Sequence, residues 1–158
     1  MKILLAIDGS HCSETAINEV CSRPWPPNTE VEVFTVIHAT VPAVYDPFFV
    51  GFAIHAELLE EERKIAPQRA DAAAKQIREA RSDLTVSIKI LEGSPKVLIV
   101  EEAERWGADL VLIGSHGYGP AKRFLLGSVS HAVVLHAPCS VEVVRNRLTQ
   151  AATENTER

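Results

Sequence analysis

The sequence lacks the features of a membrane, secreted or nucleic-acid-binding chain. It has no apolar stretch near the roughly 18 to 20 residues that span a bilayer. Its apolar start reaches Asp8 too soon to be the core of a signal peptide. The net charge is −5, from 16 Lys and Arg against 21 Asp and Glu, which is the wrong sign for holding nucleic acid or anionic lipid by bulk electrostatics. We therefore expect a cytoplasmic protein with no membrane span and no nucleic-acid partner.

Cysteine is also scarce. Cys12, Cys21 and Cys139 form neither a C-x-x-C motif nor a zinc-ligand spacing, so we expect free, buried or half-buried side chains. The 158 residues, 46% hydrophobic and 23% charged, fit one ordinary globular domain. We expect that domain over residues 1–145 and a polar, flexible tail over 146–158.

Apolar strand-like segments alternate with amphipathic helix-like segments along the chain. The expected strands are 2–7, 30–37, 85–91, 110–113 and 139–144; the expected helices are 13–20, 57–81 with an interruption at Pro67, 95–106 and 128–136. This alternation predicts an α/β domain, because parallel strands need right-handed crossover connections. The expected fold is a Rossmann-like, open, five-stranded parallel sheet with helices on both faces, and residues 85–91 have the alternating pattern of an edge strand.

Two segments follow strands at the carboxyl edge of this sheet, where open α/β sheets bind ligands. Asp8-Gly9-Ser10 follows the first strand, and a glycine-rich segment from Gly114 to Ser130 follows the fourth. Gly114 and Gly117 offer backbone without a side chain where a ligand could approach. Gly127-Ser128 opens a helix whose free amides favour an anion.

The residues alone leave several readings open. The segment is neither a Walker loop nor a dinucleotide fingerprint, so a serine-capped helix after a glycine turn is as compatible with it as a phosphate site. Asp8 alone could be a helix cap or a turn carboxylate. His116 could be a loop histidine, and His131 and His136 have no partners at the spacing of a catalytic triad. Lys122-Arg123 could reach a terminal phosphate or be a solvated pair.

In combination, these motifs resemble the universal stress protein family. Its nucleotide-binding members carry G-x-x-G, nine residues, then G-[S/T], which Gly114, Gly117, Gly127 and Ser128 match. The resemblance extends from the first strand to Ala137-Pro138-Cys139 before the last one, and Ser140 departs from the proline that the family often has there. It implies an adenine nucleotide alpha hydrolase-like fold and ATP as the ligand, with Mg.

The resemblance also assigns site residues. Asp8 would lie near the adenine and ribose, Val36 would offer backbone groups to adenine, and the loop after the fourth strand would line the ribose and α-phosphate. The segment from Gly127 would hold the phosphates with amides and hydroxyls. The implied nucleotide-binding residues are Ala6, Ile7, Asp8, Val36, Ile113, Gly114, His116, Gly117, Gly127, Ser128, Val129 and Ser130. No residue is assigned to the metal.

The expected function is a nucleotide-dependent signalling or regulatory module of the stress response, with unknown protein partners. The alternative is a slow ATPase or self-phosphorylating protein with Ser128 or Ser130 as acceptor, although no residue is a convincing general base. We also expect a homodimer through the last strand, residues 139–144. Residues 41–54 carry four of the nine aromatic residues and are expected to be a connection. It either packs on the domain or across a dimer, or forms a lid or a partner surface beside the nucleotide.

Overall fold

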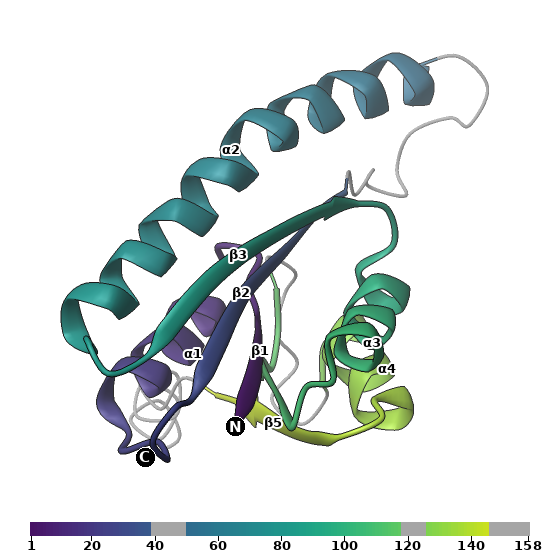
Figure 1. The fold of residues 1–158 in the computed structure, drawn as a ribbon. Helices are drawn as coiled ribbons and strands as arrows, with labels where there is room; N and C mark the ends of the chain where they lie inside the picture. The colour runs from purple at the N-terminus through teal and green to yellow at the C-terminus, as the bar shows by residue number, and fades with distance from the viewer. Residues whose placement is uncertain (39–49, 118–125, 146–158) are drawn as a thin grey trace, which may run out of the picture.

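The computed structural model describes residues 1–38, 50–117 and 126–145 (Figure 1). Strands and helices alternate through this part of the chain. In order they are β1 (Lys2–Ala6), α1 (His11–Ser22), β2 (Glu30–Ile37), α2 (Val50–Ala80), β3 (Thr85–Glu92), α3 (Pro95–Trp106), β4 (Leu110–Gly114), α4 (Ser128–His136) and β5 (Ser140–Val144). The predicted order of elements is confirmed.

The five strands form one parallel sheet in the order β3-β2-β1-β4-β5. From β1 the chain moves outward to β2 and β3, then returns to place β4 on the other side of β1 and continues to β5. The direction of winding therefore reverses between β1 and β4. Ala6 pairs with Ile113 at this reversal, so the carboxyl ends of the two strands lie together there, at the usual place for a ligand in such a sheet.

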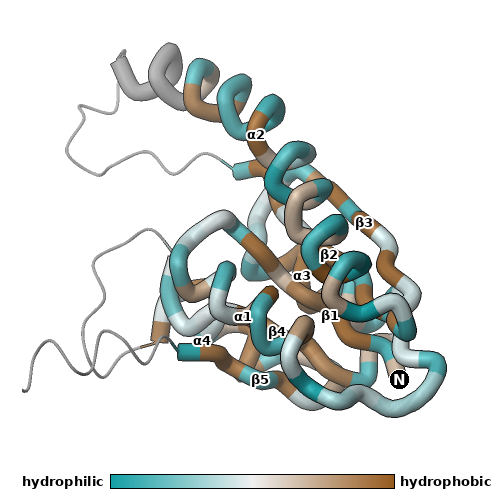
Figure 2. The backbone as a smooth tube through the Cα atoms, turned by 90° about the vertical axis from the view of Figure 1, so that its left-hand side faces the viewer, coloured by the Kyte–Doolittle hydropathy of each residue, from teal (hydrophilic) through white to brown (hydrophobic). Residues whose placement is uncertain are grey.

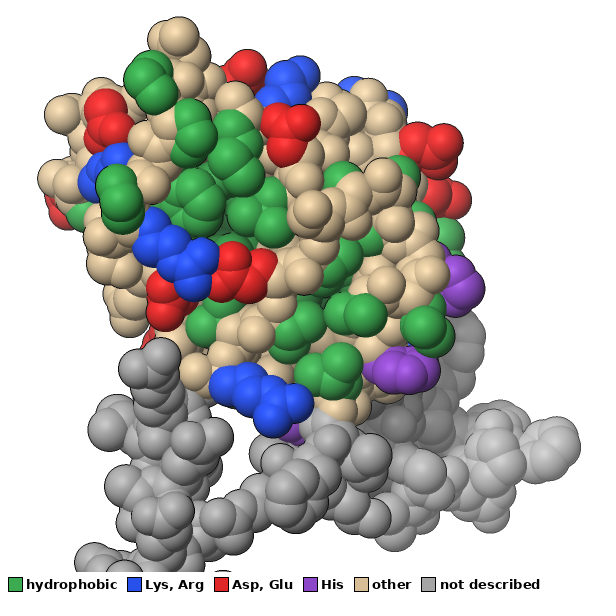
Figure 3. Space-filling view, turned by 90° about the horizontal axis from the view of Figure 1, so that it is seen from below, with side chains coloured by type: hydrophobic (Ala, Val, Ile, Leu, Met, Phe, Trp, Pro, Cys, Tyr) green, Lys and Arg blue, Asp and Glu red, His purple; other side chains and the backbone are tan. Residues whose placement is uncertain are grey.

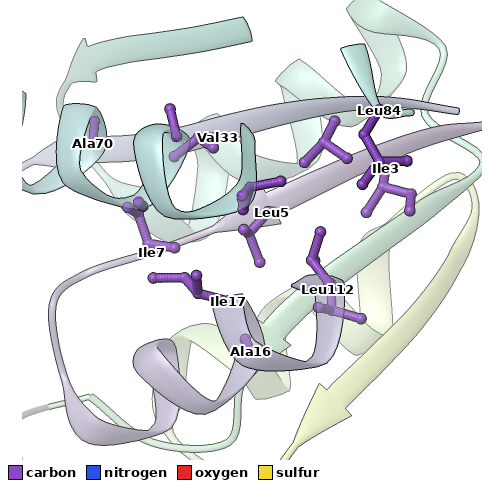
Figure 4. Packing of buried hydrophobic residues seen from close by; sticks show 14 of the residues in the cluster. Ile3, Leu5, Ile7, Ala16, Ile17, Val33, Ala70, Leu84 and Leu112 are labelled. Carbon is purple, nitrogen blue, oxygen red and sulfur yellow. The ribbon is translucent and has the colours of Figure 1, made fainter. Parts of the chain in front are cut away.

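Helices cover both faces of the sheet, with α1 and α2 on one and α3 and α4 on the other (Figure 1). Figure 2 shows hydrophobic colouring in the central strands and alternating colouring along α2. Side chains of alternate residues enter opposite layers: Ile3 and Leu5 of β1 join the core under α1 and α2, and Leu4 and Ala6 join the core under α3 and α4. Figure 4 shows the first core, in which strand side chains point at those of the two helices.

The long helix differs from the prediction at two points. It begins at Val50, so the expected connection over 41–54 is wrong for residues 50–54, and residues 39–49 lie outside the described part. No proline follows Pro47 until Pro67, so the backbone can enter the helix early. The helix also continues unbroken through Pro67, where we expected an interruption. Ala66 before the proline is buried, and Ala70, Ala73 and Ala74 after it pack in the core with the strands, so tertiary packing outweighs the missing amide donor.

Two further predictions concern membranes and cysteines. α2 is 31 residues long, but no helix in the described ranges combines the length and the apolar composition needed to cross a membrane. All three cysteines are free and half-buried, as predicted. Burial raises the pKa of the Cys21 and Cys139 thiols, which keeps these two side chains protonated and unreactive at neutral pH.

The packing of the core predicts that replacing two leucines by alanine has very different effects on stability. Leu112 in β4 is fully buried, whereas Leu135 in α4 is 62% exposed. Leu112→Ala should lower the free energy of unfolding by about 2–5 kcal/mol, because the lost methyl groups leave a cavity. Leu135→Ala should change it by less than about 0.5 kcal/mol. Urea unfolding followed by circular dichroism measures both, and equal losses would contradict this packing.

Candidate functional site

The turn after β1 fixes Asp8 at the edge of the sheet. Asp8 Oδ1 accepts a hydrogen bond from the Ser10 amide at 2.9 Å, and the Asp8 amide donates to Ser13 Oγ at 3.3 Å. Ser10 is the N-cap of α1, and its side chain accepts from the Ser13 amide. Gly9 has φ 82°, which a residue with a side chain rarely adopts. Asp8 is thus the turn carboxylate rather than the cap, and its position is set by the two serines.

The loop after β4 lies directly against this turn. A Cβ added to Gly114 would lie 2.8 Å from both the carbonyl carbon and the Cβ of Cys12, and 2.9 Å from the Ser13 nitrogen. A Cβ added to Gly117 would lie 2.6 Å from Asp8 Oδ2. We expected these glycines to leave room for a ligand. The structure instead explains both glycines without a ligand, because other atoms of the protein already fill the space that a Cβ would need.

Ser115 joins three elements at this edge. Its carbonyl accepts hydrogen bonds from the Gly127 amide at 2.8 Å and from Ser130 Oγ at 2.9 Å. Its amide donates to the Val144 carbonyl at 2.8 Å, at the end of β5. Ser10 Oγ donates to the next carbonyl, that of His116, at 3.2 Å. The beginnings of α1 and α4 are therefore both tied to the same two residues after β4.

The first turn of α4 presents uncapped amides. The first bond within the helix runs from the His131 amide to the Gly127 carbonyl, and Gly127, the N-cap, has no side chain to bond the amides of the next three residues. The N–H groups of Ser128, Val129 and Ser130 therefore have no partner within the helix, and the helix dipole adds positive potential there. An anion is the natural partner for this group of donors.

The two predicted phosphate-binding hydroxyls have different environments. Ser128 is exposed, so its hydroxyl can reach a ligand. Ser130 is 1% exposed, and its Oγ donates to the carbonyls of Ser115 and Gly127. A hydroxyl has a single proton to donate. The Ser130 hydroxyl thus fastens the start of α4 to the loop after β4.

Backbone groups near the end of β2 point past the end of β1. The Phe34 carbonyl accepts from the Ile7 amide on the β1 side, and the Ile37 carbonyl accepts from the Gly93 amide on the β3 side. Because backbone polar groups alternate along a strand, those of Val36 face the β1 side beyond the last paired residue. His38 Nδ1 lies 3.2 Å from the Val36 carbonyl oxygen, and the direction of that bond depends on the tautomer.

The His116 ring lies beside the side chain of Ser115 in the loop after β4. Its Nδ1 lies 3.2 Å from Ser115 Oγ, which in turn lies 3.6 Å from Cys12 Sγ. Its Nε2 is buried and has no hydrogen-bond partner among the described residues. A buried polar nitrogen of this kind is a candidate to bond a ligand atom.

The structure places the predicted site residues at one edge, on the ends of β1, β2 and β4 and the start of α4. Ala6, Ile7, Val36 and Ile113 are buried, and their side chains belong to the core beneath this edge. Ser10, Ser13 and Ser115 also position this edge, although none of them was among the predicted nucleotide-binding residues. The cap signature of Ser10 before α1 could have been recognised, whereas nothing in the sequence marks Ser115.

Two expected contributions lie outside the described residues, namely those of Lys122-Arg123 and of the aromatic residues before Val50. Within the described part, no group of three or more His, Cys, Asp or Glu side chains is arranged to hold a metal ion.

Comparison with known proteins places this geometry in a family. The sequence profile of the universal stress protein family matches residues 1–145. A Staphylococcus epidermidis protein named for that family is 35% identical over 149 residues, which cover 90% of this chain and 82% of the other. The chain belongs to the universal stress protein family.

Solved structures agree on the fold. The structure of hypothetical protein MJ0577 has a TM-score of 0.73 at 27% identity and covers 92% of this chain and 96% of its own. Universal stress protein UspA from Lactobacillus plantarum has a TM-score of 0.72 at 25% identity, and the match covers 92% of this chain and 97% of UspA.

Two more distant structures carry nucleotides. A universal stress protein in complex with cAMP is 23% identical with a TM-score of 0.52, and an Arabidopsis thaliana family protein with AMP bound is 16% identical with a TM-score of 0.55. They cover 91% and 100% of this chain, and 95% and 99% of their own.

The glycine contacts predict two different responses to an added methyl group. Gly114→Ala should lower the free energy of unfolding by about 1–3 kcal/mol, because two of the three nearest atoms belong to the α1 backbone and cannot move aside easily. Gly117→Ala should displace the Asp8 carboxylate instead. In an Asp8→Ala background this displacement disappears. The loss of unfolding free energy caused by Gly117→Ala should therefore be smaller there by at least about 0.5 kcal/mol. Urea unfolding of the four proteins of the cycle measures this coupling, and a value of zero would contradict the contact.

Proposed function

We propose that this protein binds ATP with Mg²⁺ at the edge formed by β1, β4 and the start of α4, and that occupancy regulates its binding to protein partners. One observation is the main support: three uncapped amides of α4 are held beside the Asp8 turn, at the point where the winding of the sheet reverses. The AMP and cAMP in two structural neighbours support an adenine nucleotide as the ligand.

In this proposal the phosphates bind at α4. The amides of Ser128, Val129 and Ser130 donate to phosphate oxygens, and the Ser128 hydroxyl adds a further donor. Ser130 acts indirectly, because its hydroxyl holds the first turn in place through Ser115. The phosphates themselves supply oxygen ligands for Mg²⁺.

The nucleoside would lie over the ends of β1 and β2. The Asp8 carboxylate, whose Oδ1 is oriented by the Ser10 amide, accepts hydrogen bonds from ribose hydroxyls. The Val36 backbone groups beyond the end of β1 bond the edge of the adenine ring, and the Val36 carbonyl exchanges its contact with His38 for one with the base. Ala6, Ile7 and Ile113 form the floor, and Gly114, His116 and Gly117 form the wall toward α4.

The phosphate part of this proposal predicts a large loss of affinity in Gly127→Val. Gly127 has φ −60°, which valine can adopt, but its Cβ would lie 3.1 Å from the Ser115 carbonyl oxygen and 3.3 Å from His116 Cα. The start of α4 must shift away from the loop, so ATP binding should weaken more than tenfold, or about 1.4 kcal/mol. Isothermal titration calorimetry with ATP and Mg²⁺ measures the change.

The control is Leu135→Ala at the exposed, far end of the same helix, which should bind ATP like the wild type. Unchanged affinity in a folded Gly127→Val protein would contradict phosphate binding at α4.

The same titration with excess chelator tests whether ATP binding requires Mg²⁺. Labelled ATP at single turnover tests the role: stoichiometric retention of intact ATP supports a binding module, and phosphate release that stops in Ser128→Ala would indicate an enzyme.

We further propose that two copies pair through β5. In the described sheet β5 pairs only with β4, and the Ser115 amide bonds the Val144 carbonyl on the β4 side. By alternation, the backbone groups of Val141 and Val143 face the open side. Their side chains pack under α3 and α4, and Arg23 Nη1 holds Glu142 Oε2 at 2.7 Å on the other face. Figure 3, which views the molecule from the side where β5 lies, shows hydrophobic side chains gathered beside acidic and basic ones.

This pairing predicts that Val143→Pro gives a monomer. Proline removes the amide on the open side and leaves the bonds between β4 and β5 intact. Val143→Ala is the matched control, because it keeps the amide and should remain a dimer. Light scattering at micromolar concentration separates the two states. A monomeric wild type, or a dimer in the proline variant, would contradict the proposal.

A further inference from the structure

Two buried glutamates meet between β2 and α3, away from the proposed nucleotide site. Glu32 of β2 is 6% exposed and Glu102 of α3 is 3% exposed. Each carboxyl group affects the pKa of the other, so the two lie close enough to form a hydrogen bond when one is protonated. Two ionised carboxylates can only accept hydrogen bonds, so this bond forms only while one of the pair carries a proton.

Arg105 decides which carboxyl keeps the proton. Its Nε donates to Glu102 Oε2 at 2.9 Å, and its Nη2 donates to Glu102 Oε1. This guanidinium lowers the pKa of Glu102, which therefore stays ionised. Glu32 has no such partner, because its Oε1 is buried without a hydrogen bond to any described residue. An ionised Glu32 would thus leave an uncompensated charge in the interior.

The other groups around Glu32 do not compensate that charge. Glu102 and Arg105 of α3 and Lys89 of β3 are the charged groups that act on Glu32, and its register neighbour on β1 is the apolar Leu4. Burial contributes most to the shift, followed by the hydrogen bond with Glu102 and its negative charge; Arg105 and Lys89 oppose it. Together they raise the pKa of Glu32 from 4.5 to about 7. Glu32 therefore titrates in the neutral range.

We propose that Glu32 and Glu102 form a one-proton switch, which fastens α3 to the sheet while Glu32 is protonated and loosens it when Glu32 ionises. Ionisation replaces the shared hydrogen bond with repulsion between two buried carboxylates. The affected helix packs with α4 in the same core layer, so the switch acts on the face of the sheet that also carries the proposed phosphate site. The proposal concerns the fold and does not depend on nucleotide binding.

The direction of the pH dependence follows from the raised pKa. The folded protein holds the Glu32 proton more tightly than the unfolded chain does. The stability due to this group is therefore complete below the ordinary pKa of 4.5, falls as the pH rises toward about 7, and stays low above it. The lowered pKa of Glu102 acts the other way, but only at more acidic pH.

Glu32→Gln tests the switch, because glutamine is always neutral and its amide can still donate to Glu102. Between about pH 5 and about pH 8 the urea midpoint of the wild type should fall relative to that of the variant, which should be the more stable protein at the upper end. Glu30→Gln is the matched control: Glu30 is an exposed glutamate of the same strand, so this variant should follow the wild-type profile. Parallel profiles for the wild type and Glu32→Gln would overturn the proposal.

Two further measurements test the switch without comparing urea midpoints. Carbon NMR titration of the Glu32 carboxyl in the wild type should give a midpoint near neutral pH, and a midpoint near 4.5 would overturn the switch even if Glu32→Gln failed to fold. Hydrogen exchange at about pH 8 should show α3 amides less protected in the wild type than in Glu32→Gln, with no such difference at about pH 6. If the amides of α1 and α2 lost as much protection as those of α3, the effect would not be local to α3.

Discussion

The candidate site depends on the carbonyl of Ser115. This one oxygen accepts hydrogen bonds from the Gly127 amide and from the Ser130 hydroxyl, and thereby holds the first turn of α4 against the loop after β4. The following carbonyl, of His116, accepts from Ser10 at the start of α1. In the described part of the chain, the helix that offers amides to an anion and the turn that offers a carboxylate are thus positioned by two successive peptide groups. Their relative geometry is built into the backbone before any ligand arrives, which reduces the entropy lost on binding.

The glycines of the motif therefore have two roles that the spacing alone does not separate. Gly114 and Gly117 are required by the close approach of Cys12, Ser13 and the Asp8 carboxylate, and the approach at Gly127 is to Ser115. A chain of this fold would need small residues at these positions even without a ligand. The stronger support for an anion comes from α4, where a glycine N-cap leaves three amides without a side-chain acceptor. The same glycine that lets the helix approach the loop also keeps its amides free.

The sequence was sufficient for the order of the elements and for the sheet edge at which the predicted residues meet, because buried strands read as apolar runs and helices as amphipathic segments between cap and turn residues. It was not sufficient where the structure depends on distant partners. No motif marks Ser115 in the sequence, because its importance comes from the hydrogen bonds that its carbonyl accepts from distant residues. Nothing in the local sequence marks Glu32 of β2 as buried, because its burial depends on α3, which packs on that strand. The long helix continues through Pro67, and the alanines that follow it are buried in the core with the strands.

The glutamate pair and the proposed phosphate site lie on the same face of the sheet but at different positions along the strands. Glu32 and Val36 are four residues apart on β2, or about 13 Å at about 3.3 Å per residue. The direct effect of the Glu32 charge falls with that distance, although salt screens a buried charge less than an exposed one. The packing of α3 on α4, which enter one core layer together, is a second route for coupling. Linkage requires this coupling to be reciprocal: if loosening α3 weakens nucleotide binding, then bound nucleotide raises the proton affinity of Glu32 by the same factor.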